Sequence, residues 1–95
     1  MGRKVDKEIR NQLYHAVLAL ENEEECKAFF EDLCTVTEIF SLSQRLEVAK
    51  MLRQKKTYLT IAEETGASTA TISRVNRTLN YGNGMYDVIL NKMKL

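Results

Sequence analysis

The sequence predicts an all-α protein, built from about six short helices within a single domain of residues 1–95. No proline interrupts the 95 residues. Apolar residues recur three and four positions apart along most of the chain, which is the spacing of helices that bury one face. Residues that cap helices precede several of these runs, and two pairs form capping-box patterns, Asn22 with Glu25 and Thr35 with Glu38.

The N-terminal part is expected to contain two amphipathic helices. The first runs from about Asp6 to Leu20. The second begins at Asn22, where the acidic Glu23 and Glu24 suit the positive end of a helix, so these carboxylates are assigned to stability and not to catalysis. The apolar sides consist of Ile9, Leu13, Ala16, Val17 and Leu20 in the first helix and of Phe29, Phe30, Leu33 and Cys34 in the second.

A long third helix is expected from Thr35 to about Lys55. Its apolar residues cover too much of the circumference for one stripe, which predicts burial on several sides. These residues are Ile39, Phe40, Leu42, Leu46, Val48, Ala49, Met51 and Leu52. After the segment described next, residues 81–84 form a loop, and a short last helix runs from Met85 to Lys94.

The stretch from Thr57 to Asn80 has the pattern of a helix-turn-helix. Its first helix covers about 58–65 and is capped by Thr57, and small Ala62 allows the second helix to cross closely. Gly66 stands where the chain must turn through a positive φ, and Ser68 caps the second helix. The inner face of that helix carries Ile72, Val75 and Leu79. Thr65 departs from the pattern, because an aliphatic residue is expected to fill that position better.

The outer face of the second helix carries short polar groups, a methyl group and two guanidinium groups, which suit base edges and phosphates of duplex DNA. Lys55 and Lys56 precede the motif, where they are expected to contact phosphates and orient the domain. The candidate DNA-binding residues are Lys55, Lys56, Thr57, Ser68, Thr69, Ala70, Thr71, Ser73 and Arg77.

The charge distribution agrees with this interpretation, although the net charge is only +1. Residues 1–44 contain five basic and nine acidic residues, whereas residues 45–80 contain seven basic and three acidic ones. The basic half therefore contains the motif, and its modest charge predicts DNA binding that weakens steeply with salt.

A homodimer is expected, because six helices in so few residues leave much apolar surface uncovered, above all on the first helix. No apolar run has the length of a membrane span, and the N-terminus lacks the apolar segment of a signal peptide, so a cytoplasmic location is expected.

The chain offers little for catalysis or metal binding. His15 is the only histidine, and no phosphate-binding glycine loop or nucleophile–base pair is present, so no enzyme, catalytic residue or metal site is predicted. Cys26 and Cys34 would lie about 12 Å apart along one helix, too far for an internal disulfide, and are expected to be reduced and partly buried. The alternative to a DNA-binding regulator is a protein-interaction module that keeps the motif for packing.

The segment SQRLEVAKMLRQKKTYLTIAEETGASTATISRVNRTLN resembles the Trp repressor family, and most specifically so in GASTATISRVNRTLN. It is similar to a Trp-repressor-related branch of small bacterial regulators. The resemblance covers roughly 33–90. It implies an intertwined, all-helical homodimer, whose paired recognition helices enter successive major grooves of a near-palindromic operator. Such a protein is a sequence-specific transcriptional regulator, in this family a repressor.

The resemblance also implies a candidate effector site at Arg45, Arg74, Val75 and Thr78. In tryptophan-binding members one arginine holds the ligand carboxylate and a second stacks on the indole; Arg45 and Arg74 fall at, or within one residue of, these positions. Val75 stands where those members have glycine, and overfilling such a slot costs about 1–3 kcal/mol, which disfavours L-tryptophan. Binding without any effector and binding of another small molecule both remain open, as does direct base contact by Arg74.

Overall fold

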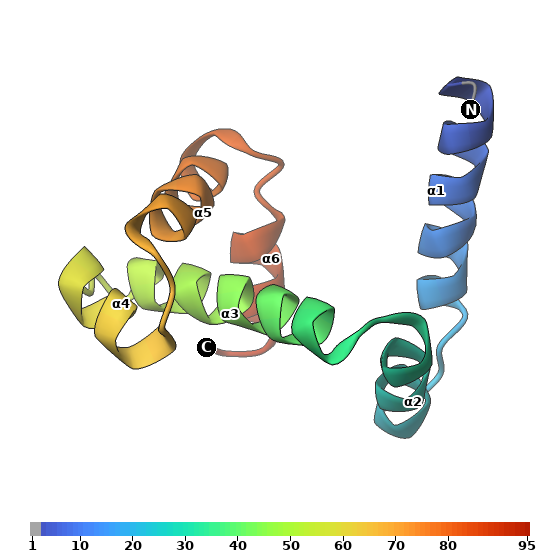
Figure 1. Cartoon of the computed structure of the whole chain (residues 1–95), viewed down its shortest axis with the longest axis horizontal. Coiled ribbons are helices and arrows are strands. Elements are labelled where there is room, and N and C mark those ends of the chain that lie inside the picture. Colours follow the sequence, from blue (N-terminus) through green and yellow to red (C-terminus); the bar gives the residue numbers. More distant parts are fainter. Residues whose placement is uncertain (1–2) are drawn as a thin grey trace. The chain divides into compact units, whose positions relative to one another are not determined.

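The computed structural model describes the backbone of residues 3–95 and the side chains of residues 6–95. Over these residues the chain forms six helices and no strand, so the predicted all-α class is confirmed (Figure 1). The helices are α1 (Arg3–Leu18), α2 (Glu23–Leu33), α3 (Val36–Arg53), α4 (Tyr58–Thr65), α5 (Thr69–Tyr81) and α6 (Met85–Lys92). The first helix ends two residues earlier than expected, at Leu18, and the last ends at Lys92.

The predicted cap of α2 forms with one difference in register. The Asn22 side chain accepts a hydrogen bond from the Glu25 amide at 2.9 Å, as the capping-box pattern requires. The Glu25 carboxylate accepts from the amide of Glu21 at 3.0 Å, one residue before the expected partner. Glu25 thus has a structural role at this helix end, and Glu23 and Glu24 lie in the same first turn.

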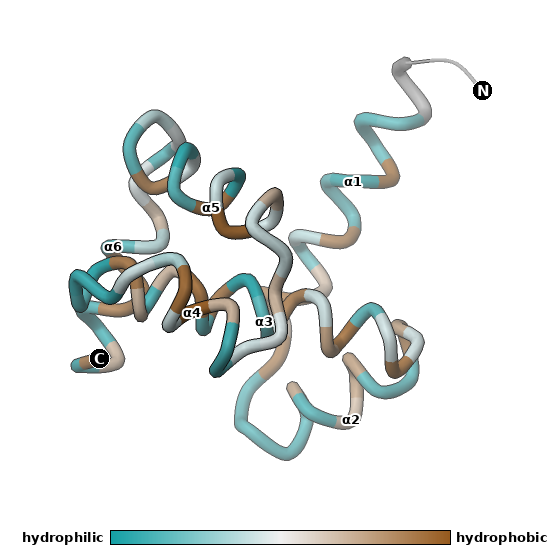
Figure 2. The backbone as a smooth tube through the Cα atoms, turned by 60° about the vertical axis from the view of Figure 1, so that its left-hand side comes forward, coloured by the Kyte–Doolittle hydropathy of each residue, from teal (hydrophilic) through white to brown (hydrophobic). Residues whose placement is uncertain are grey.

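The chain divides into two compact units, residues 1–36 and residues 37–95. The first unit contains α1 and α2, and none of its described side chains is buried. Hydrophobic positions recur along α1 (Figure 2). Ile9, Leu13 and Val17, which lie on one face of that helix, are 53%, 41% and 38% exposed. Within one chain this apolar face is largely open to solvent.

The second unit contains the hydrophobic core. The C-terminal half of α3 packs there with α4, α5 and α6. The fully or almost fully buried residues are Val48, Ala49 and Met51 of α3, Ile61 of α4, Ala67 of the turn, Ile72 and Val75 of α5, and Leu90 of α6. This core fixes α4 and α5 on the rest of the unit.

The expectation that α3 is buried on several sides is wrong for its first half. Phe40 and Leu42 are 59% and 45% exposed, whereas Val48 and Ala49 are completely buried. The reason is that the residues of the core come from the later turns of α3. The sequence correctly shows apolar residues around the helix, but it does not show which of them another element of the same chain covers.

The two cysteines are free, and their environments differ from the expectation. Cys34 is half-buried and follows α2, where its amide donates to the Phe30 carbonyl at 2.9 Å. Cys26 is exposed, so the expected partial burial is wrong for this thiol. No helix within the described residues is both long and apolar enough to cross a membrane.

Candidate nucleic-acid interface

Helix α4 begins with the predicted cap. The Thr57 hydroxyl oxygen accepts a hydrogen bond from the Thr60 amide at 3.1 Å, and Thr57 itself is exposed. Ile61 is completely buried and Ala62 packs against the core from a half-buried position, so the inner face of α4 is the one predicted. Tyr58 and Leu59 are 36% and 70% exposed.

The turn between α4 and α5 is held by three successive residues. Gly66 has φ +73°, the left-handed conformation expected of it, and its amide donates to the Ala62 carbonyl at 2.9 Å. Thr65, at whose position an aliphatic residue was expected to fit better, bonds to the backbone on both sides through its hydroxyl. Its hydroxyl donates to the Ile61 carbonyl at 2.7 Å and accepts from the Ala67 amide at 3.1 Å.

Helix α5 presents one face to the core and the other to solvent. The Ser68 hydroxyl oxygen accepts from the Thr71 amide at 3.1 Å and caps the helix as predicted. Ile72 and Val75 are buried, and Leu79 packs against the core. The exposed residues of this helix and its cap are Ser68, Thr69, Ala70, Ser73, Arg74, Arg77, Thr78, Asn80 and Tyr81.

Thr71 differs from the other candidate DNA-binding residues of α5. It is half-buried, and its hydroxyl oxygen accepts a hydrogen bond from the Ser68 hydroxyl at 3.1 Å. Its side chain therefore supports the start of α5. The exposed candidates on the first two turns are Thr69, Ala70 and Ser73.

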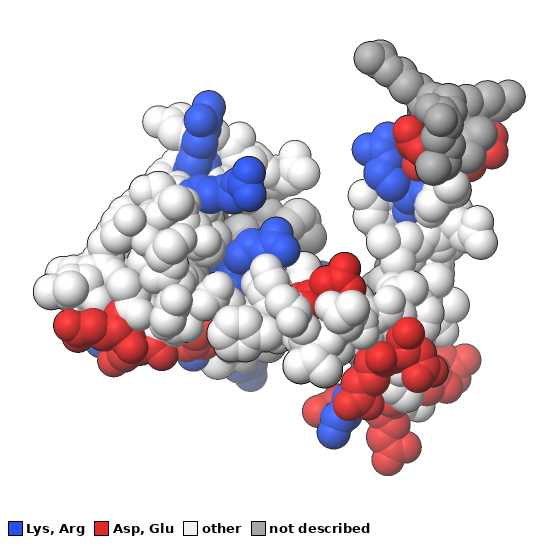
Figure 3. All heavy atoms as spheres, viewed as in Figure 1, with Lys and Arg blue, Asp and Glu red and all other residues white. Residues whose placement is uncertain are grey.

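The basic residues near the motif fall into two groups. Lys50 pairs with Glu47 at 2.9 Å and Arg53 with Asp87 at 3.2 Å, so these two cations are engaged within the unit. Neither pair involves Lys55, Lys56, Arg74 or Arg77, which are all exposed. In Figure 3, basic side chains project around α5 while acidic ones lie along α4.

Lys55 is held in an unusual backbone conformation, with φ +64°. This left-handed conformation costs a residue with a Cβ roughly 1–2 kcal/mol. It ends α3 in a tight turn, in which the Lys56 amide donates to the Met51 carbonyl at 3.1 Å. The turn places two consecutive exposed ammonium groups immediately before the cap of α4.

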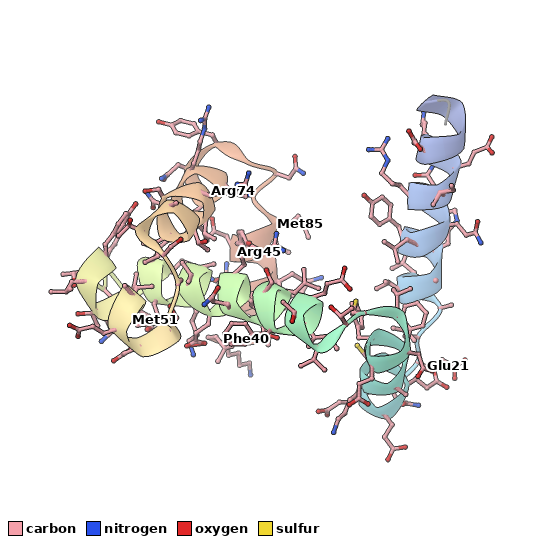
Figure 4. The ribbon with its side chains drawn as sticks, viewed as in Figure 1. Glu21, Phe40, Arg45, Met51, Arg74 and Met85 are labelled. Atoms are coloured by element: carbon pink, nitrogen blue, oxygen red, sulfur yellow. The ribbon has the colours of Figure 1, made fainter. Side chains whose placement is uncertain are left out.

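The four candidate effector residues have different surroundings. Arg45 is half-buried and Arg74 is exposed, and in the view of Figure 4 both extend toward the side where Met85 begins α6. Val75 is only 2% exposed and is part of the core. The Thr78 hydroxyl donates to the Arg74 carbonyl at 3.2 Å within its own helix.

A cavity of about 310 Å³ lies between α3, the end of α5 and α6. It is mainly apolar and is lined by Leu46, Thr78, Leu79, Asn83, Gly84, Met85, Tyr86, Asp87 and Ile89. Of the candidate effector residues, only Thr78 contributes to this lining. The structure therefore does not bring all four around this cavity.

Two residues that hold the helix-turn-helix in place were not predicted from the sequence. Ala67 is 5% exposed and packs the turn against the core. Its burial could have been predicted, because it is a small apolar residue between Gly66 and Ser68. The other is Gln44, whose side-chain amide reaches the carbonyl of Thr65 at 3.0 Å. No pattern in the sequence indicates this contact, because the two residues are 21 positions apart.

The described residues contain no group of three or more His, Cys, Asp or Glu side chains that could hold a metal ion. The geometry of α4, the turn at Gly66 and α5 is that of the helix-turn-helix class of proteins. A profile of the Trp repressor protein family matches residues 8–94, and the chain belongs to this family.

The chain is similar to three further proteins, of which the two solved structures are described as TrpR-like or as a putative Trp repressor. The chain is 60% identical over 93 residues to the uncharacterized protein YerC of Bacillus subtilis (strain 168), covering 98% of this chain and 85% of that protein. The structure of the present chain is similar to that of a TrpR-like protein from Eubacterium eligens ATCC 27750. The TM-score is 0.90 and the identity 56%, and the match covers 99% of this chain and 97% of that one. A putative Trp repressor from Staphylococcus aureus matches with a TM-score of 0.84, 57% identity and coverage of 99% and 89%.

Proposed function

We propose that this protein is a sequence-specific DNA-binding transcriptional regulator, a repressor that occupies a near-palindromic operator as a homodimer. The observation that carries the proposal is the composition of the solvent face of α5. Short side chains and two arginines are exposed there, and no acidic residue occurs between Glu64 and Asp87. Membership of the Trp repressor family supports the same class of function.

The exposed residues suggest a division of roles. Thr69 and Ser73 offer hydroxyl groups to base edges, and the Ala70 methyl suits contact with the methyl group of thymine. Arg77, Lys55 and Lys56 supply charges for phosphates, which position the protein without reading the sequence. Because these cations are exposed, the affinity should fall as salt is raised, with a slope set by the number of phosphates that they contact.

The first unit supports the dimer. None of its described side chains is buried within one chain, although α1 carries a regular apolar face. Two helices without a buried side chain cannot offset the conformational entropy lost on ordering them. A second copy of the chain would cover this face, and its two-fold symmetry would place two recognition helices on two half-sites.

In this proposal the protein binds its operator without L-tryptophan. Val75 fills the position that glycine opens in tryptophan-binding members, and it lies within the packed core. The nearby cavity has no arginine in its lining to hold a carboxylate. Isothermal titration calorimetry with tryptophan should give no binding heat; saturable heat would show that the core reorganises around this ligand.

The proposal is tested by selecting genome-derived duplex fragments with the purified protein at about 0.15 M salt, where weak phosphate attraction is damped. Recovery of a shared near-palindromic sequence, followed by tight binding to that duplex alone, is expected. Equal recovery of unrelated fragments would show that the motif does not read sequence.

A further inference from the structure

Gln44 connects α3 with the end of the first motif helix. It is half-buried, and its Nε2 donates a hydrogen bond to the carbonyl oxygen of Thr65 at 3.0 Å. Thr65 is the last residue of α4, and carbonyl groups at this end of a helix have no partner within the helix. The Gln44 amide therefore satisfies a carbonyl that would otherwise need water or another donor.

The carbonyl of Thr65 belongs to a turn in which each of three residues is held by a specific bond. The Thr65 hydroxyl bonds to the carbonyl of Ile61 and the amide of Ala67, and the Gly66 amide bonds to Ala62. These bonds are all local and fix the shape of the turn. The bond from Gln44 comes from a different helix and fixes the position of the turn on α3.

The other contacts described between α3 and the motif belong to the apolar core. Packing of Val48 against the core is non-directional, whereas a hydrogen bond favours one geometry. The other side-chain bonds described between distant helices run from Arg53 to Asp87 and Asn91 of α6 and do not involve the motif. Gln44 thus supplies a directional restraint on the motif.

We propose that Gln44 is a positioning residue that sets the angle at which α5 leaves the turn and so determines how accurately this helix reads sequence. The inference rests on the proposed DNA-binding function. Readout of base edges depends on side-chain geometry, whereas attraction to phosphates tolerates small rotations. Loss of the bond should therefore lower the affinity for the operator more than the affinity for unrelated DNA.

The test uses Gln44→Met, which keeps the length and helix preference of the side chain but removes the amide donor. Ser43→Ala is the matched control, because the Ser43 hydroxyl bonds to the Ile39 carbonyl of its own helix at 2.7 Å and not to the turn as described. Gln44→Arg should restore a donor. The adjoining cavity of about 220 Å³, lined in part by Glu47 and Glu64, has room for the longer side chain.

The ratio of operator affinity to scrambled-duplex affinity is measured by fluorescence anisotropy at one salt concentration. Loss of one partly buried hydrogen bond should lower this ratio severalfold in Gln44→Met, with about fivefold as the upper limit, and the ratio should recover in Gln44→Arg and stay unchanged in Ser43→Ala. An unchanged ratio in Gln44→Met, or an equal fall of both affinities, would overturn the proposal.

Hydrogen exchange provides a readout that does not depend on DNA. Amides of residues 65–72 should exchange several-fold faster in Gln44→Met than in the wild type or Ser43→Ala. Unchanged exchange there would overturn the positioning role. A wild-type protein that selects no duplex sequence would refute the proposed function, while the exchange experiment would still decide whether Gln44 holds the turn.

Discussion

The substitution Ala70→Asp should have opposite effects on stability and on DNA binding. Ala70 is the second residue of α5, is exposed and lies next to the unpaired amides at the positive end of the helix. A carboxylate there should stabilise the folded protein by about 0.3–1 kcal/mol at low salt. Because the side chain leaves the core untouched, no compensating loss of packing is expected.

In the complex, the same carboxylate would face phosphates and base acceptors in the major groove. Two like charges about 4 Å apart repel by about 1 kcal/mol in bulk water and by about 4 kcal/mol at an effective dielectric constant of 20. With more than one phosphate in range, operator affinity should fall roughly 100-fold or more. Ala70→Asn is the control, because it adds a side chain of similar size without charge.

Thermal unfolding at low salt and fluorescence anisotropy at about 0.15 M salt measure the two effects. A higher unfolding temperature together with weak binding is expected for Ala70→Asp, and Ala70→Asn should bind more tightly than the charged variant. Operator affinity equal to that of the wild type would refute the placement of α5 in the groove. A lower unfolding temperature would contradict the position of Ala70 at the helix N-terminus.

The remaining predictions concern the turn, the helix end, the dimer and the phosphate contacts. Gly66→Ala should lower the free energy of unfolding by about 1 kcal/mol, as measured by urea denaturation, solely because φ is +73°. Gly82→Ala should cost about 1–3 kcal/mol in the same assay, because the new Cβ would lie 2.6 Å from the Thr78 carbonyl oxygen; equal stability to wild type would contradict that approach. Leu13→Asp should shift sedimentation equilibrium from dimer to monomer, and an unchanged dimer would exclude the face of α1 from the interface. Lys55→Gly relieves a positive φ and removes a charge, so binding should weaken for all duplexes, with a salt slope smaller by about one; a loss confined to the operator would contradict a phosphate contact.

The helices and the motif could be predicted because their signals are local. Caps such as Asn22 and Ser68 and the turn at Gly66 depend on residues within four positions of each other, and all three form as expected. The candidate DNA-binding residues lie between positions 55 and 77, before α4 and at the start and along α5, so the same local rules give their places in the motif. Whether they contact DNA is a separate proposal.

Burial and long-range contacts could not be predicted in the same way. Periodicity identifies the apolar residues of a helix but not what covers them, which explains the exposed Phe40 in the first half of α3 and the exposed Cys26. The hydroxyl bonds of Thr65 to Ile61 and Ala67 were not predicted, because they depend on the path of the backbone at the turn. The contact of Gln44 with that turn depends on how α3 and α4 pack, which no local pattern encodes.

A hydroxyl-radical footprint of the selected duplex tests the central claim most directly. If two recognition helices of a symmetric dimer enter successive major grooves, protection should appear as two symmetry-related patches, with half-sites centred roughly one helical turn apart. Uniform protection along the fragment would contradict the proposal that this chain binds DNA as a helix-turn-helix dimer. Protection of a single half-site when the duplex is saturated with protein would contradict it as well.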